Sequence, residues 1–243
     1  MIFSKIRYKF FSSTKKRNIY YITLKHNWST FWDGFYITSK VKEQFGVNIE
    51  AKFYSKDIKN SILHFGSRHL YLPNGYKKVH RSNRVVFTWF HGTDEQMEYN
   101  NALPEGSKRS AVIHTSCSIS KNFMIKWGAD PNKIIVVPLG VDLGLFHPVS
   151  DDIKNRKRKE LGIPDGALLI GSFQKDGVGL DEGLEPKLIK GPDVFCSVVE
   201  QLAKNYPVHV LLTGPARGYV KKRLSENKIP YKHIYLSNYK DIG

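Results

Sequence analysis

Short apolar stretches alternate with longer amphipathic stretches along most of the chain. The short stretches are rich in β-branched and aromatic residues, which favours strands, and the longer ones have helical spacing. This alternation is typical of βα units and of a parallel sheet. Strands are expected at Ile19–Leu24, Val47–Phe53, Ser61–Phe65, Val85–Phe90, Ala111–Thr115, Lys133–Val137, Ala167–Phe173, Val208–Leu212 and His233–Leu236.

The first helix is expected to open at Asp33-Gly34 and to run to about Phe45. Three more are expected at Ser118–Trp127, Pro192–Asn205 and Arg217–Glu226. The charged stretch Asp151–Lys159 separates two βα series, so we expect two domains, residues 1–150 and 151–243. A doubly wound sheet usually needs more strands than the three that follow this boundary. We therefore expect the second domain to be incomplete in this chain.

The composition is that of a globular protein, with 41% hydrophobic residues and none of the long apolar stretches that cross a membrane. The N-terminus is too interrupted by charge for a secretory signal. The two cysteines, Cys117 and Cys196, are therefore expected to be reduced thiols in the cytosol.

The formal net charge is +16, and residues 1–150 carry most of it, with 22 Lys and Arg against 10 Asp and Glu. Such a charge makes nucleic acid, anionic lipid and phosphorylated substrates candidate partners. The first 17 residues hold six basic groups and no acid, interleaved with apolar residues. This segment suits an anionic membrane surface, and equally a solvated arm.

Ligands of open α/β sheets bind beyond the carboxyl ends of the strands. In this chain polar and glycine residues gather at those ends in both series, and two facing edges of this type would form a cleft between the domains. His91 follows an apolar strand and precedes a glycine, which is compatible with a structural or a catalytic role.

Lys190-Gly191 stands directly before the helix that begins at Pro192. A helix N-terminus and a lysine both favour an anion, and Lys175 and Lys187 are further candidates for it. A pair of phosphates fits this pattern, although the lysines could also be solvated loop charges. The run Gly177–Gly183 departs from a dinucleotide fingerprint, and there is no Walker A loop. The histidines show no metal-ligand spacing, so no metal site is expected.

The stretch Ala111–Pro148 resembles a run near the end of the first domain in the retaining GT-B glycosyltransferases of family 4. It contains Pro138-Leu139-Gly140-Val141-Asp142, in which Leu139 replaces the family's usual asparagine. Leu169–Asp193 is similar to the family's donor-binding segment, and Val208–Gly214 to its next strand. The resemblance covers nearly the whole chain, and implies two Rossmann-like domains facing a cleft.

The resemblance assigns roles to individual residues. Lys190 matches the lysine that binds the donor diphosphate, Lys175 is a substitute for a companion arginine, and His91 matches a histidine at the donor sugar. Gly34 matches a glycine loop that faces the phosphate and the acceptor. The other candidates are Gly171, Gly191 and Gly214 for the donor, and Trp32, Asp33 and His69 for the acceptor side. The family's pair of glutamates is expected beyond Gly243.

The implied reaction transfers a sugar from a UDP- or GDP-linked donor to a glycan, lipid-linked or other hydroxyl acceptor. Anomeric configuration is retained, and neither a metal nor another cofactor is needed. The implied place of action is the cytoplasm, or the inner face of the membrane. Two alternatives remain: a basic nucleic-acid- or polyanion-binding module, for which no basic helix or stacking face appears, and a GT-B nucleotide-sugar epimerase or phosphorylase.

Overall fold

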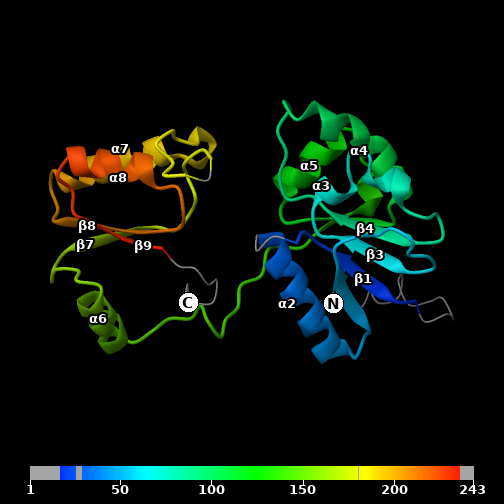
Figure 1. Ribbon diagram of the computed structural model, residues 1–243, viewed down its shortest axis with the longest axis horizontal. Helices are drawn as coiled ribbons and strands as arrows, with labels where there is room; N and C mark the ends of the chain where they lie inside the picture. Colours follow the sequence, from blue (N-terminus) through cyan, green and yellow to red (C-terminus); the bar gives the residue numbers. More distant parts are fainter. Residues whose placement is uncertain (1–16, 26–28, 180, 236–243) are drawn as a thin grey trace. The chain divides into compact units, whose positions relative to one another are not determined.

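The structure is a computed structural model that describes residues 17–25, 29–179 and 181–235. It divides into two compact units at Gly140, and each unit is an α/β fold built on a parallel sheet (Figure 1). Residues 141–150, which we had assigned to the first domain, lie in the second unit. None of the helices in the described ranges is long and apolar enough to cross a membrane.

The sheet of the first unit has six strands in the order β2-β1-β3-β4-β5-β6, and every neighbouring pair is parallel. The strands are β1 (Ile19–Ile22), β2 (Ile49–Lys52), β3 (Ile62–Phe65), β4 (Arg84–Thr88), β5 (Val112–Thr115) and β6 (Ile134–Val136). The parallel sheet expected from the sequence is thus confirmed, with most strands slightly shorter than the apolar runs that predict them. All six strands end at one edge of the sheet, because they run in one direction.

Helices cover both faces of this sheet (Figure 1). One face carries α3, α4 and α5, and the other carries α2, which packs against β1 and β2. The helices are α2 (Ser29–Phe45), α3 (Arg68–Tyr71), α4 (Met97–Arg109) and α5 (Ser118–Lys126), with short 3-10 turns η1 (Gly75–Lys78) and η2 (Pro131–Lys133).

Helix α4 was not expected from the sequence, because it is mostly polar and contains both Pro104 and Gly106. Tertiary contacts explain it. Leu103 is fully buried, and Gly106 lies so close to Leu72 that a Cβ there would meet the leucine side chain at 2.6 Å. Packing of this buried stripe therefore outweighs the poor intrinsic helix propensity.

The core of the first unit lies between the sheet and α3, α4 and α5. Alternate strand residues point to this side, among them Leu63, Phe87 and Ile113, which are fully buried. The Phe87 ring stacks on Tyr71 with ring centroids 4.8 Å apart. The alternate positions, on the opposite face of the sheet, include the polar residues His64, Thr88 and His114 among apolar ones.

The second unit has a three-stranded parallel sheet in the order β7-β8-β9 within the described residues. Helices α7 and α8 cover one face, and α6 lies on the other side (Figure 1). The elements are α6 (Asp151–Glu160), β7 (Leu168–Ser172), η3 (Leu188–Lys190), α7 (Pro192–Ala203), β8 (Val208–Thr213), α8 (Gly218–Glu226) and β9 (Tyr231–Ile234). Strand β9 begins two residues earlier than expected. The core of the second unit includes Val210, Leu212 and Cys196, all fully buried.

We predict that Leu103→Ala lowers the free energy of unfolding of the first unit by about 2–5 kcal/mol, because it leaves a cavity in a fully buried position. Leu139→Ala is the matched control, since Leu139 is 65% exposed, and we expect a change within about 0.5 kcal/mol. Urea unfolding of the two variants measures both. Equal losses would show that α4 does not pack as described.

Candidate functional site

The carboxyl ends of β3 and β4 bring together two histidines that the sequence singled out separately. His69 follows β3 in α3, and His91 stands three residues after β4; both are exposed. The pKa of His69 lies below its ordinary value because of partial burial and the nearby charges of Arg68 and His91. The His69 ring also packs edge-on against Tyr99, with centroids 4.8 Å apart.

Arg68 is a feature of this strand-end region that sequence reasoning missed. Its side chain is only 3% exposed, and its guanidinium lies 4.5 Å from the Trp89 ring centroid and 5.0 Å from that of Tyr99. Nη2 donates to Gln96 Oε1 at 2.6 Å, whereas Nη1 has no hydrogen-bond partner in the described structure. The sequence marked the strand-end segment that contains Arg68, but the burial of its charge between aromatic rings has no sequence signal.

Nη1 of Arg68 points at the backbone after β4. A Cβ on Gly92 would lie 2.9 Å from this nitrogen and 2.8 Å from the Trp89 ring, so a side chain at position 92 would crowd both. No carboxylate forms an ion pair with Arg68 within the described ranges. The region beside His69 and His91 therefore carries a buried positive charge that the protein itself does not neutralise, which favours negative charge on a ligand bound there.

The segment Trp32-Asp33-Gly34 differs from expectation. Helix α2 begins at Ser29, so Gly34 lies inside the helix and not at its N-terminus. It is buried, and a Cβ there would meet the Tyr21 ring at 2.9 Å. Its backbone N–H is therefore within the helical ladder and is not offered to a phosphate. The glycine is explained by the close approach of α2 to β1.

The neighbours of Gly34 face different surroundings. Asp33 is half-buried, and burial raises its pKa, while the nearby His114 opposes this shift. Trp32 lies in an aromatic row along α2, with Phe31 at 5.5 Å and Phe35 at 6.1 Å between centroids. Both side chains thus belong to the α2 side of the sheet, and their assignment to an acceptor stays a prediction.

A chain of hydrogen bonds crosses the sheet beneath α2. His114 Nε2 lies 3.1 Å from the Val137 carbonyl, which can only accept, so Nε2 carries the proton. Its Nδ1 then accepts from the Thr88 hydroxyl at 3.2 Å, and Thr88 Oγ1 accepts from His64 Nε2 at 2.9 Å. Burial and the nearby His114 hold the pKa of His64 at about 3. Burial also lowers the pKa of His114, so both histidines favour their neutral forms.

In the second unit, Gln174 lies next to most of the residues that the sequence predicts to bind the sugar donor. Its side-chain amide donates to the Lys190 carbonyl at 3.0 Å, and its own carbonyl accepts from Arg217 Nη1. A Cβ on Gly214 would lie 3.3 Å from the same carbonyl and 3.7 Å from Lys175 N. The loop after β7 and the end of β8 therefore meet at one point. Sequence reasoning passed over Gln174, because a single polar loop residue carries no motif.

Lys190 and Gly191 lead into α7. Lys190 is exposed at the end of η3, and Gly191 has a φ of +65°, a left-handed conformation that favours glycine. Its carbonyl accepts from Phe195 N at 2.9 Å, which closes the first turn of α7. Lys175 is half-buried on the other side of Gln174. Lys190 thus carries positive charge directly before this helix, where the helix dipole also favours an anion.

Gly171 has a different surrounding from the other donor candidates. It lies within β7, paired with Leu211 of β8, and a Cβ there would collide with the ring of Phe173. The absence of a side chain therefore makes room for that ring. The structure brings together Lys175, Gly214, Lys190 and Gly191, and leaves Gly171 in the strand before them.

A buried ion pair holds the loop in place. Arg217 Nη2 lies 3.2 Å from Asp176 Oδ2, and both side chains are at most 1% exposed. The same nitrogen donates to Ser172 Oγ at 2.8 Å, while Nη1 donates to the carbonyls of Gln174 and Thr213. One guanidinium thus connects the end of β7, the loop after it and the end of β8.

The glycine run after Asp176 has a structural explanation. The carbonyls of Glu182 and Gly183 accept from Gly218 N and Tyr219 N at 2.7 and 2.9 Å. Gly218 and Tyr219 are the first two residues of α8, so the loop carbonyls accept hydrogen bonds from two backbone N–H groups at the start of this helix. Gly177 and Gly183 both lie against the Ala216 carbonyl, where a Cβ would collide. The run therefore packs against α8 and is not a dinucleotide fingerprint.

No group of three or more His, Cys, Asp or Glu side chains within the described ranges is placed to hold a metal ion. Both cysteines are free; Cys117 is exposed and Cys196 is buried.

No protein-family profile matches the chain. It is 33% identical over 113 residues to a D-inositol 3-phosphate glycosyltransferase of Corynebacterium kroppenstedtii. The matched residues make up 44% of this chain and 22% of that protein. The match thus spans about a fifth of the relative's length.

Solved structures show the fold. The complex of Anabaena Alr3699/HepE with UDP and glucose has a TM-score of 0.63 at 11% identity, covering 92% of this chain and 70% of that one. A glycosyltransferase from Rickettsia africae has a TM-score of 0.56 at 14% identity, covering 94% and 70%. The expected fold class is confirmed: the chain has the α/β fold with parallel sheets of GT-B glycosyltransferase structures.

We predict that Asp176→Ala lowers the free energy of unfolding of the second unit by about 3–5 kcal/mol, because it leaves the Arg217 charge buried without a partner. Glu160→Ala removes a carboxylate from two ion pairs, with Arg156 and Lys157, whose side chains are at least half exposed, and we expect a loss within about 0.5 kcal/mol. Chemical unfolding of both variants measures the two losses in the free energy of unfolding. Similar losses would contradict the burial of the Asp176–Arg217 pair.

A second prediction concerns pH. The folded-state pKa of His64 lies below its unfolded value, so the unfolded chain binds the extra proton and stability falls as pH falls from about 6.5 toward 3. His64→Gln keeps a donor for Thr88 but does not titrate. The wild-type stability should therefore decline more steeply than that of the variant, by up to about 1.4 kcal/mol per pH unit. Unfolding at several pH values measures this, with the exposed His80→Gln as control; parallel curves for wild type and His64→Gln would refute it.

Proposed function

We propose that this chain acts as a retaining GT-B glycosyltransferase of family 4 and binds both donor and acceptor. The observation that carries the proposal is the meeting of Lys175, Lys190 and Gly214 around Gln174, at the carboxyl ends of β7 and β8. This is where α/β sheets bind ligands, and the arrangement suits the diphosphate of a nucleotide sugar. The similarity to D-inositol 3-phosphate glycosyltransferases supports the same assignment.

The chemistry follows from the charge that develops as the sugar–phosphate bond breaks. Negative charge grows on the leaving diphosphate, and Lys190, Lys175 and the α7 N-terminus stabilise it electrostatically. These groups supply the positive charge that a metal ion provides in other enzymes, so the proposed reaction needs none. The donor is a UDP- or GDP-linked hexose, in line with the UDP and glucose bound by the Anabaena protein of similar fold.

On the acceptor side, we assign His91 to the donor sugar near the reacting carbon and His69 to the acceptor. The positive charge of Arg68 beside them orients the negative charge of the substrates. In a retaining transfer the hydroxyl attacks from the face of the leaving group, and the leaving phosphate oxygen takes its proton. The protein then needs no separate general base.

The acceptor is proposed to be a hydroxyl of a glycan or of a lipid-linked sugar. The surplus of basic residues in positions 1–150 supports action at the anionic inner face of a membrane. Of the basic N-terminal segment, residues 1–16 lie outside the described residues.

The test is calorimetric titration of the protein with UDP and with GDP at two salt concentrations. We expect saturable binding of one nucleotide, and a loss of roughly tenfold or more in affinity for Lys190→Ala, because a charge-assisted contact to phosphate is lost. Lys204→Ala removes the same charge at the other end of α7 and should bind like wild type. If neither nucleotide binds, or if both variants lose affinity equally, the donor-site assignment is wrong.

A further inference from the structure

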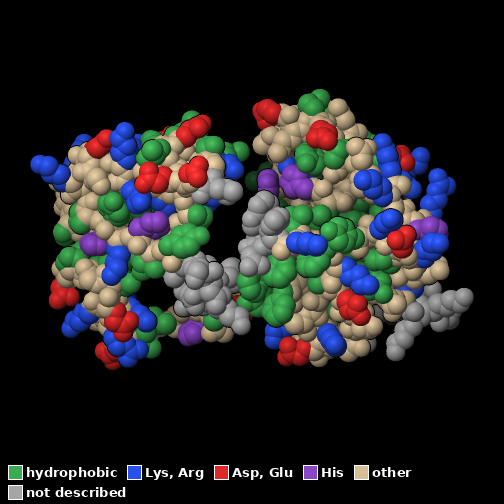
Figure 2. All heavy atoms as spheres, viewed as in Figure 1, with side chains coloured by type: hydrophobic (Ala, Val, Ile, Leu, Met, Phe, Trp, Pro, Cys, Tyr) green, Lys and Arg blue, Asp and Glu red, His purple; other side chains and the backbone are tan. Residues whose placement is uncertain are grey.

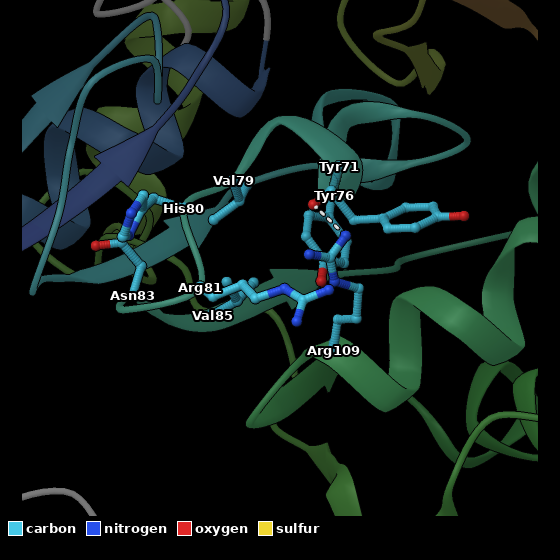
Figure 3. A pocket seen from close by; sticks show the side chains of 8 residues that line it. All are labelled: Tyr71, Tyr76, Val79, His80, Arg81, Asn83, Val85 and Arg109. Atoms are coloured by element: carbon cyan, nitrogen blue, oxygen red, sulfur yellow. Dashed lines mark hydrogen bonds between the residues drawn. The ribbon is translucent and has the colours of Figure 1, made fainter.

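The first unit contains a pocket of about 190 Å³ at the edge of the sheet opposite His91 (Figure 3). One wall is the segment that leads into β4, and the other is the end of α4. The lining residues are Tyr71, Tyr76, Val79, His80, Arg81, Asn83, Val85 and Arg109. None of them is among the residues assigned above to donor or acceptor.

Two guanidinium groups give the pocket its charge. Figure 3 shows Arg81 and Arg109 extending toward one another from the two walls. Arg109 is held in place, because Nη1 donates to the Tyr76 carbonyl at 3.1 Å and the group lies 5.6 Å from the Tyr76 ring centroid. Neither arginine forms an ion pair with a carboxylate of the described chain. Two positive charges thus converge without a negative partner.

The rest of the lining adds no negative charge. Val79 and Val85 are buried apolar residues, and the Tyr71 hydroxyl donates to the Gly106 carbonyl at 3.2 Å. Burial raises the pKa of Tyr71 far above its usual range, so it stays neutral. The one carboxylate close enough to influence Tyr71 is Glu105, which is exposed and does not line the pocket.

The wall that carries Arg81 is fixed by the fold. Asn83 Nδ2 donates to the Ile58 carbonyl at 2.6 Å, and its Oδ1 accepts from Ser61 N at 3.0 Å. Arg17 Nη1 donates to the Ser82 carbonyl at 3.1 Å. These contacts attach the segment to the start of β3. A pocket whose walls are already in place loses little entropy when it binds a ligand.

The surroundings strengthen the positive field. Lys77, Lys78 and Arg84 belong to the same stretch of chain as Arg81, which has no acidic residue from position 74 to 84. In Figure 2 lysine and arginine side chains gather over this side of the first unit, at the amino ends of its strands. Such a field attracts anions toward the pocket.

We infer that this pocket is a second ligand site, which binds a small molecule carrying an oxyanion on a compact apolar body. The arginines match the planar geometry of a phosphate or carboxylate, and the tyrosine and valine side chains match the body. The site lies at the amino ends of the strands, whereas the proposed reaction takes place at their carboxyl ends. It is therefore separate from the proposed donor and acceptor residues, and ligand binding there does not depend on the proposed function.

The test is an NMR titration of the protein with phenyl phosphate and, separately, with benzoate, at constant ionic strength. The arginine Nε–Hε signals are assigned from the variants Arg81→Gln and Arg109→Gln. We expect saturable shifts of the Arg81 and Arg109 signals with at least one probe, and affinity reduced roughly tenfold in Arg81→Gln. The probe that binds with higher affinity shows whether the pocket prefers a phosphate or a carboxylate.

Lys78→Gln is the charge-matched control, because Lys78 is exposed in the same stretch but does not line the pocket. It should bind as wild type does. Arg109 supports Tyr76, so Arg109→Gln can also affect folding, whereas Arg81 makes no hydrogen bond within the described structure and its loss leaves the fold intact. The inference is overturned if neither probe shifts these two signals, or if Lys78→Gln weakens binding as much as Arg81→Gln.

Discussion

Parallel strand pairing is the constraint on which the rest of this structure depends. Every described strand in both sheets runs in the same direction as its neighbours, so each βα loop returns to the same edge. Residues far apart in sequence, such as His69 and His91 or Lys190 and Gly214, are brought to one edge for this reason. The residues proposed to bind donor and acceptor lie at this edge in each unit, because parallel strands place the loops that follow them on one side.

Within the second unit, the guanidinium of Arg217 fixes the conformation of the loop at that edge. Arg217 reaches Asp176, Ser172 and the Gln174 carbonyl, and thereby holds the backbone on either side of Lys175. A buried charge pair adds little net stability, but it specifies one arrangement, because every alternative leaves a charge unpaired. The position of Lys175 is thus set by residues that never need to contact a substrate.

The first unit has opposite edges with different chemistry. Its carboxyl edge holds His69, His91 and the buried Arg68, while its amino edge holds the pocket between Arg81 and Arg109. Positive charge is thus present at both ends of the strands of this unit, where loops form much of the surface.

The sequence by itself determined the succession of strands along the chain and the parallel α/β class, because apolar periodicity is a local signal. It also singled out Lys190 and Gly191 before a helix, and their role in binding a donor stays a prediction. It misplaced the start of α2 and missed α4, Arg68, Gln174 and the Asp176–Arg217 pair. These depend on contacts between residues up to 45 positions apart, such as Arg217 with Ser172. Only the tertiary structure decided which charges are buried, because burial depends on neighbours in space and the local sequence around a residue does not show it.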